Sequence, residues 1–385
     1  MTRNAYGDDF DAIIVGARCS GAATAMLLSE RGARVLVVDH GQPGTDTMST
    51  HALMRGAVFQ LRKWGLLDSI VEAGTPAVRR TSFIYDGDVV DVDLKPEYGV
   101  DALYAPRRTL LDATLAEAAA AAGAELRYGT GCAGLLFDET GRVRGARLRT
   151  PSGATEEVRA PLVIGADGRR SAVARHVGAG ITRRAAHSVA CVYRYFEGLP
   201  NRGYRWHFAP GAAGGIIPTN DGLSCVFVAV PPAVHAEARV LGAATLEELM
   251  ARHLPVLAEE AAGAVAVAKQ VTFPGALGYF RQSAGPGWAL VGDAGYFRDP
   301  ITAHGITDAL RDAEVLADAI AAGRLADYPA LRDALSAEIF DLTDRIAALD
   351  GTMEEVQALH YALNRAMKAN QKWIAGMDGS LSRAA

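Results

Sequence analysis

The sequence predicts an α/β fold in which a Rossmann-type domain receives an inserted antiparallel β-sheet domain and is followed by C-terminal helices. Three observations predict this class. Apolar runs that end in glycine-containing turns occur three times along the 385 residues. Between the second and third of them lie short aromatic and β-branched runs separated by Gly, Pro and Asn-Asp turns, which are typical of antiparallel strands. Near the C-terminal end, apolar residues recur at helical spacing.

The first motif is a strand–helix–strand unit. Asp11–Val15 is an apolar run that enters a turn at Gly16. Cys19–Glu30 then favours a helix, and Arg34–Val38 is a second apolar run that ends at Asp39. Such a unit of about thirty residues brings backbone N–H groups and a helix N-terminus to a pyrophosphate. An acid at the end of the second strand suits the ribose hydroxyls, so the unit predicts dinucleotide binding.

The turn of this unit departs from the usual GxGxxG pattern. It reads Gly16-Ala17-Arg18-Cys19-Ser20-Gly21, with Arg18 where the middle glycine normally gives the phosphates room. Either the Arg18 side chain points away from the nucleotide, or its guanidinium approaches a phosphate. A βαβ unit without any nucleotide is the alternative interpretation of this motif alone.

Two further strand-to-turn signals follow along the chain. Leu162–Gly165 is an apolar run that leads into Ala166, Asp167 and Gly168. Trp288–Val291 leads into Gly292 and Asp293 in the same way. Each signal predicts a buried strand whose carboxyl end carries an acid, which is where open α/β sheets bind their ligands.

This ordered set resembles the single-component FAD-dependent monooxygenases of the para-hydroxybenzoate hydroxylase-like class. The resemblance extends over residues 11–316, and the same architecture serves flavin halogenases and geranylgeranyl-reductase-like enzymes. It implies a Rossmann-type FAD-binding domain with an inserted substrate domain. The expected boundaries are 1–185 for the first part of the FAD-binding domain, with a small strand region near 80–100, then 186–284 for the substrate-covering sheet. Residues 285–325 would complete the FAD-binding domain, and 326–385 would form C-terminal helices.

The resemblance also implies roles for individual residues. Gly16, Ala17, Arg18 and Gly21 would cradle the FAD pyrophosphate, and Asp39 would bind the adenosine ribose. Arg108 begins an Arg-x-x-Leu-Asp segment that would bond near the FAD phosphates or ribose. Backbone at Cys132 would meet the adenine. Asp167 and Gly168 would serve FAD and NAD(P)H, and Gly292 and Asp293 would hold a ribityl hydroxyl.

The segment after Asp293 keeps part of the family pattern Pro-x-x-Gly-x-Gly-x-Asn. Pro300 and Gly305 match it, whereas Ala303 replaces a glycine and Thr307 replaces the asparagine. A helix is expected over Ile306–Ala322, with its N–H groups at Gly305 and Ile306 facing the flavin N1–C2 edge, where reduced flavin carries negative charge.

The aromatic residues of the inserted sheet suggest a substrate pocket. Strands are expected at Ser188–Phe196, Tyr204–Ala209, Gly215–Pro218 and Ser224–Val230. Their aromatic side chains would line the pocket or fill the core of the sheet, and strict alternation is expected to turn only some of them inward. The residues concerned are Tyr193, Tyr195, Trp206, Phe208 and Phe227.

Two histidines are candidates for acid–base chemistry. His51 ends a loop over Thr45–His51, which in the family approaches the flavin, and His304 precedes the expected helix near the flavin. An unperturbed imidazole titrates close to neutral pH, which suits proton transfer. A structural role is the alternative for each.

Composition excludes several classes of function. A formal net charge of −5 gives no basic field for nucleic acid. The four cysteines form no CxxC pair, which suits a reducing cytosol and predicts no metal site. With no signal-like start and no long apolar run, a cytoplasmic protein without membrane contact is expected. Helices over Leu331–Leu349 and Met353–Lys372 would pack on the main domain or on a second subunit of a homodimer.

The predicted function is that of an FAD-dependent monooxygenase. NADH or NADPH would reduce the FAD, and O2 would add to it to give a C4a-hydroperoxyflavin. That species would hydroxylate or epoxidise a small organic substrate, aromatic or polycyclic in kind. A flavin-dependent reductase or dehydrogenase and a halogenase are the enzyme alternatives, although the halogenase-type Trp-x-Trp-x-Ile-Pro segment is missing. A flavin-binding redox sensor without catalysis is the alternative of another class.

Overall fold

The computed structural model describes residues 9–376 and contains a Rossmann-type sheet at its centre. Five strands run parallel, so crossover connections join them. A sixth, β18, is antiparallel at the edge. The strand order is β18 (Ala284–Gly285), β19 (Trp288–Leu290), β9 (Val163–Gly165), β1 (Ala12–Val15), β2 (Val35–Asp39) and β5 (Glu125–Tyr128).

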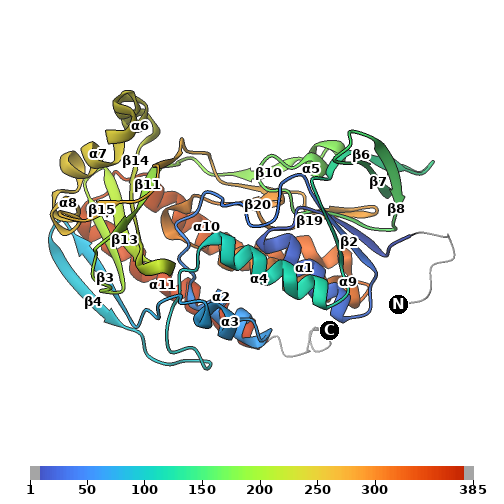
Figure 1. Cartoon of the computed structure of the whole chain (residues 1–385), viewed down its shortest axis with the longest axis horizontal. Helices are drawn as coiled ribbons and strands as arrows, with labels where there is room; N and C mark the ends of the chain where they lie inside the picture. The colour runs from blue at the N-terminus through green and yellow to red at the C-terminus, as the bar shows by residue number, and fades with distance from the viewer. Residues whose placement is uncertain (1–8, 377–385) are drawn as a thin grey trace.

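The two faces of this sheet are covered differently (Figure 1). One face packs against helices α1 (Cys19–Glu30), α4 (Arg108–Ala121) and α9 (Gly305–Ala321). The other packs against a three-stranded sheet and the short helix α5 (Ala172–His176). That small sheet consists of β6 (Gly131–Phe137), β7 (Val143–Arg149) and β8 (Thr155–Arg159).

A second large sheet, called the roof here, lies at the other end of the molecule (Figure 1). Its eight strands are antiparallel except for the parallel pair β3–β12. The strands are β3 (Arg80–Tyr85), β4 (Asp88–Asp93), β11 (Ala190–Glu197), β12 (Tyr204–Ala209), β13 (Ala212–Pro218), β14 (Ser224–Val230), β15 (Val265–Ala266) and β16 (Val271–Phe273). Strands β3 and β4 lie in the region near 80–100, and they join the roof rather than the central sheet.

The two faces of the roof belong to different cores. Its outer face packs under α6 (Pro232–Ala238), α7 (Thr245–His253) and α8 (Pro255–Glu260). Its inner face shares the largest buried cluster with the central sheet and its helices. The roof therefore closes over the Rossmann part through a continuous apolar core.

The remaining elements connect and buttress these layers. Strands β10 (Ile181–Arg184), β17 (Tyr279–Arg281) and β20 (Tyr296–Phe297) form a small antiparallel sheet. Helices α2 (Arg55–Lys63) and α3 (Leu67–Glu72) follow the first βαβ unit, and α10 (Tyr328–Ala347) and α11 (Met353–Ala375) end the described chain. Helix α11 begins with a Thr352–Glu355 capping box and packs on α2 and α10. No helix within residues 9–376 is long and apolar enough to cross a bilayer.

Candidate functional site

A cavity of about 770 Å³ lies between the carboxyl ends of the central strands and the roof. Its volume is within the range of ligand pockets, roughly 300–1,000 Å³. Most of the sequence-predicted cofactor residues line it, namely Gly16, Arg18, Asp39, Arg108, Cys132, Asp167, Gly168, Gly292, Asp293, Pro300, Gly305 and Ile306. Ala17 instead lines an adjoining cavity of about 280 Å³. Gly21 lies on the wall of neither of these two cavities.

The turn after β1 is built on two glycines that permit close approach. Gly16 has a φ of 110°, and a Cβ added there would lie 2.4 Å from the carbonyl oxygen of Ala166. A Cβ on Gly21 would lie 1.8 Å from the carbonyl oxygen of Gly16. Larger side chains would push α1 away from β1 and β9. The turn therefore aims the first N–H groups of α1 into the cavity, where they favour an anion.

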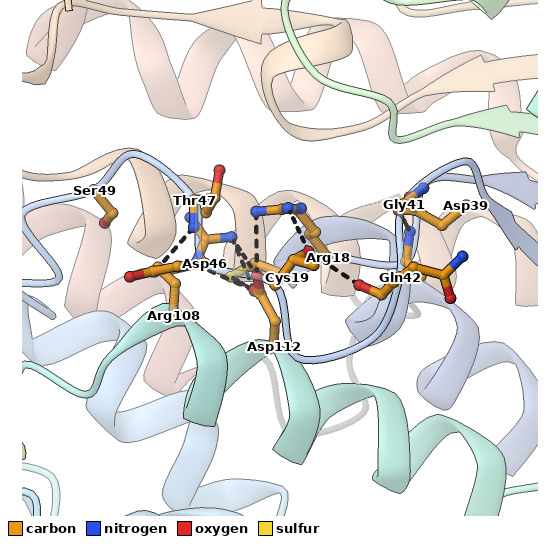
Figure 2. A network of polar contacts seen from close by, with 12 residues as sticks. Arg18, Cys19, Asp39, Gly41, Gln42, Asp46, Thr47, Ser49, Arg108 and Asp112 are labelled. Carbon is orange, nitrogen blue, oxygen red and sulfur yellow. Dashed lines mark hydrogen bonds and ion pairs between the residues drawn. The ribbon is translucent and has the colours of Figure 1, made fainter. Parts of the chain in front are cut away.

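Arg18 occupies the position of the missing glycine, and its side chain lies beside Asp112 (Figure 2). Its backbone precedes α1, and its guanidinium turns sideways, with Nη2 donating to Thr45 Oγ1 at 3.4 Å. Nη1 lies 3.8 Å from a carboxylate oxygen of Asp112. The side chain lines both cavities.

A second arginine completes this polar network (Figure 2). Arg108 begins α4 and donates to both carboxylate oxygens of Asp112, at 2.9 and 3.0 Å. The thiol of Cys19 donates to the same carboxylate at 3.1 Å, and burial raises the pKa of that thiol. The cluster places a held cation next to the N-terminus of α1.

The acid at the end of β2 is already oriented by the backbone. Asp39 accepts from the Ala17 N–H at 2.8 Å and from the Gly41 N–H at 2.7 Å. Thr130, Gly131 and Cys132 form the adjoining wall. This end of the cavity therefore offers a carboxylate for ribose hydroxyls and a backbone wall at which an adenine could lie.

The third motif brings a buried carboxyl to the opposite end. Asp293 follows β19, and burial raises its pKa to about 6, while Arg169 and Arg108 oppose the shift. Gly305 and Ile306, at the N-terminus of the long helix α9, line the same region. Negative charge at this end would be stabilised by the helix dipole.

In the second motif, one carboxylate oxygen of Asp167 accepts a hydrogen bond from the described residues and the other does not. Oδ2 accepts from the Ala172 N–H at 2.6 Å, at the start of α5. Oδ1 is buried and has no hydrogen-bond partner among residues 9–376. The glycine cradle, the two acids at opposite ends and this unpartnered oxygen together fit an extended dinucleotide such as FAD. A family model described as an FAD binding domain matches residues 9–326.

The chain belongs to the FAD binding domain family.

Named relatives of this FAD-binding chain include reductases. It is 28% identical over 335 residues to a digeranylgeranylglycerophospholipid reductase of Methanosarcina mazei, covering 82% of this chain and 77% of the relative. It is 27% identical over 366 residues to a menaquinone reductase of Mycolicibacterium smegmatis, covering 88% and 84%.

Solved structures of flavoenzymes share the fold. The Pseudomonas aeruginosa protein PqsL, in complex with 2-aminobenzoylacetate, has a TM-score of 0.79 at 22% identity, covering 91% of this chain and 99% of PqsL. The myxobacterial chondrochloren halogenase CndH, an FAD-dependent enzyme, has a TM-score of 0.78 at 21% identity, covering 97% and 92%. The predicted FAD-binding fold is thus confirmed, and the chain is a flavin-dependent oxidoreductase by family.

His51 lies at the junction of the FAD cavity and the roof. It is 1% exposed, lines the cavity and has a φ of 67°, which is uncommon for a residue with a side chain. Nε2 makes a short contact with the Tyr195 hydroxyl, and buried Nδ1 has no partner among the described residues. Burial lowers the pKa of His51 to about 3, so the ring is neutral near pH 7.

Tyr195 in turn is held by the loop before α2 and by the start of α4. The guanidinium carbon of Arg107 lies 3.9 Å from the centre of the Tyr195 ring, and Arg107 pairs with Asp46 at 2.8 Å. The neighbouring Tyr193 hydroxyl accepts the Ser49 N–H at 3.2 Å. Two adjacent tyrosines of β11 therefore tie the 45–51 loop to the roof.

The five predicted pocket aromatics all lie on the inner face of the roof, which corrects the expectation that only some would turn inward. Tyr193 is directly opposite Phe227, and Phe227 and Trp206 are both opposite Gly215. Tyr195 and Phe208 follow at spacings of two, which returns a strand side chain to the same face. Of the five, only Tyr193 is on the cavity wall. Tyr195, Trp206, Phe208 and Phe227 are buried in the core beneath it.

His304 is placed away from the FAD cavity wall. It immediately precedes α9, and its Nδ1 lies 2.6 Å from the Thr302 carbonyl oxygen. It is buried, and burial lowers its pKa to about 4. These contacts give it a structural role at the start of the helix, and its catalytic role stays a prediction.

Several residues of the cavity wall were not predicted from the sequence. They are Arg169 beside the Asp167-Gly168 turn, Cys191, Phe273 and Phe297 near the roof, and the buried pair Arg298–Asp308, whose charged atoms lie 2.6 Å apart. A signal existed only for Arg169, which follows a recognised acid–glycine turn. The others come together through tertiary packing of β11, β16 and β20.

Proposed function

We propose that this chain is an NADH- or NADPH-dependent FAD monooxygenase that inserts oxygen into a small apolar organic substrate. The observation that carries the proposal is the single cavity that joins the FAD residues to the inner face of the roof. One wall holds the Asp39, Asp293 and Gly305 positions, and the other holds Cys191, Tyr193 and Phe273. A substrate on the roof side would meet the flavin ring inside one enclosure.

When bound, FAD supplies the redox chemistry, accepting a hydride equivalent from the nicotinamide and reacting with O2. The residues of the chain bind and orient it. Gly16, Arg108 and the α1 N-terminus would hold its phosphates, and Asp39 its ribose. Helix α9, beginning at Gly305, would stabilise negative charge on the ring. The apolar side chains of the roof would keep water from the reacting atoms.

His51 is the hydrogen-bonding group that we assign to contact with the substrate. It lies on the cavity wall next to the roof, and the Tyr195 hydroxyl fixes the orientation of its ring. With its pKa lowered to about 3, the neutral imidazole suits a hydrogen bond to a substrate oxygen rather than acceptance of a proton.

A flavin-dependent reductase is the second candidate, and a specific observation favours it. The two relatives named above are reductases of a digeranylgeranyl lipid and of menaquinone, and each is matched over more than three quarters of its length. Both names indicate large apolar substrates, which agrees with an apolar roof. Reduction would use the same cavity and the same FAD, without insertion of oxygen.

Isotope labelling separates the two. Aromatic and isoprenoid compounds would first be screened for stimulation of NAD(P)H oxidation by the holoprotein. A compound that is turned over would then be incubated under heavy-isotope O2 and, in parallel, without O2. Monooxygenation predicts one labelled oxygen atom in the product and no product in the anaerobic sample. Unlabelled product that also forms anaerobically would contradict the proposal and support the reductase.

A further inference from the structure

Arg169 lies where the two halves of the cavity meet. It follows the Asp167-Gly168 turn after β9, and it lines the cavity. Its guanidinium carbon is 4.8 Å from the ring centre of Phe273 and 5.1 Å from that of Phe297. Phe273 belongs to roof strand β16, whereas Phe297 belongs to β20, next to Asp293. The guanidinium therefore contacts one ring of the roof and one ring from the FAD side.

Among residues 9–376, Arg169 has no counter-ion, in contrast to three other arginines of the cavity wall, and the exposed Arg170 beside it shares this feature. Arg18 and Arg108 contact Asp112, and Arg298 pairs with Asp308. Within residues 9–376, the Arg169 side chain makes neither an ion pair nor a hydrogen bond, and its nitrogen atoms are not sealed from solvent. The positive charge of Arg169 lowers the pKa of Asp293 and so opposes the rise caused by burial, but the two side chains form no ion pair.

The surroundings of this guanidinium match one kind of ligand group. A planar arginine fork binds a carboxylate through two parallel hydrogen bonds, and contact with two aromatic rings restricts the movement of the fork in advance. Ordering the side chain before binding lowers the entropy cost of the contact. The same two phenyl rings offer apolar surface to whatever carries the carboxylate.

We infer that Arg169 binds a carboxylate of the organic substrate, so that the substrate is an apolar, aromatic-type acid. This inference rests on the proposed function for the existence of such a substrate. The location favours substrate over cofactor, because the guanidinium contacts a ring of the roof, Phe273. The FAD phosphates have their own donors at the Gly16 turn and Arg108, which lie among the residues of the first βαβ unit and α4. A phosphate of NAD(P)H or of FAD shares the chemistry and is distinguished by the test.

The test uses holoprotein and matched pairs of probes. Benzoate and naphthoate would be titrated against their uncharged amides, with the visible absorption of bound FAD as the readout. The variants are Arg169→Gln and Arg169→Lys. Two further variants serve as controls. Arg170→Gln removes the neighbouring charge, which is exposed and also lines the cavity, and Arg184→Gln removes an exposed charge on β10, away from the cavity wall.

Wild type should bind an acid more tightly than its amide. Arg169→Gln should raise the Kd of the acid about tenfold or more and leave the amide unchanged, because a charge-assisted contact is lost. The Kd of the acid for Arg169→Lys should lie between the values for wild type and Arg169→Gln, because lysine keeps the charge but lacks the planar fork. Arg170→Gln and Arg184→Gln should keep most of the preference for the acid.

Three results would overturn the inference. One is a wild-type protein that shows no preference for any acid over its amide. Another is equal weakening of acid and amide by Arg169→Gln. The last is an Arg169→Gln variant that keeps its preference for the acid but has a raised Kd for FAD, or a raised Kd for NADH in anaerobic reduction of the flavin. That result would assign the guanidinium to a phosphate. The titrations measure binding without turnover. Their outcome therefore does not depend on whether the labelling experiment supports monooxygenation.

Discussion

At the scale of single residues, the acid of the third motif is the clearest test of how the cavity holds FAD. Asp293 lies on the cavity wall, and burial raises its pKa to about 6. Asp293→Ala should weaken FAD binding about tenfold or more, because a hydrogen bond to a charged group contributes roughly 1.5–3 kcal/mol. Titration of the apoprotein with FAD, followed by flavin fluorescence, measures this. Asp88→Ala, at an exposed site on β4, is the control, and an unchanged Kd in folded Asp293→Ala would contradict the assignment.

The same carboxyl predicts a pH dependence of the apoprotein. Its folded-state pKa of about 6 lies above the reference value of 3.8, so the folded state binds the proton more tightly than the unfolded state. Ionisation therefore costs stability as the pH rises from about 4 to about 6. Relative to Asp293→Asn, wild-type apoprotein should lose unfolding free energy over that window and then stay level. Parallel pH profiles of the two proteins in urea unfolding would contradict this.

The contact between His51 and Tyr195 is a second residue-scale test. Tyr195→Phe leaves a buried histidine nitrogen without its partner, which should cost about 1–3 kcal/mol of unfolding free energy. Tyr361→Phe is the matched control, because Tyr361 is 59% exposed and should change stability by less than about 0.5 kcal/mol. Urea unfolding of both variants measures the difference, and equal stabilities would show that the contact contributes nothing.

At the scale of elements, the approach of α1 to β1 depends on a glycine. Gly21→Ala would place a Cβ 1.8 Å from the Gly16 carbonyl oxygen, so α1 must shift. Overpacking of this kind costs about 1–3 kcal/mol or more, and it should also displace the N–H groups aimed at the phosphates. Gly180→Ala, where an added Cβ meets nothing within 4 Å, is the control. Thermal unfolding and FAD titration should both separate the two variants, whereas identical behaviour would contradict the packing argument.

The elements that follow local rules are those the sequence predicts best. The helix expected over Cys19–Glu30 has the same bounds in the structure, and the strand expected over Ser224–Val230 does too. Strand β13 begins at Ala212, three residues before the predicted Gly215, because its alanines and glycines carry no strand signal and are ordered by β12 and β14. The parallel pairing of β3 with β12 joins residues more than a hundred positions apart, which no local pattern reveals.

The site shows the same division. The acids and glycines that end strands were predictable, since parallel strands bring their carboxyl ends to one edge. Side chains placed by contact between distant elements were not, as with Phe273 and Phe297, which both contact Arg169. The inward face shared by Trp206, Phe227 and Tyr193 depends on register across β11–β14, which the separate strands do not specify.

At the scale of the whole molecule, the central sheet and the roof enclose a cavity with an aspartate at each end. Asp39 lies at the adenosine end, and Asp293 lies at the end where α9 begins. The contacts at Asp39 and along Thr130–Cys132 have a use only if the flavin carries an adenosine half. The arrangement therefore requires the complete dinucleotide, and FMN would leave that end of the cavity empty.

Reconstitution of the apoprotein with FAD and with FMN is the most direct measurement of this claim. The structure predicts one FAD bound per chain and FMN binding weaker by about a hundredfold, or ~2.7 kcal/mol, because the adenosine contacts are lost. Protein purified with its flavin should likewise release FAD on denaturation. Equal affinity for the two flavins, or release of FMN alone, would contradict the placement of FAD along the whole cavity.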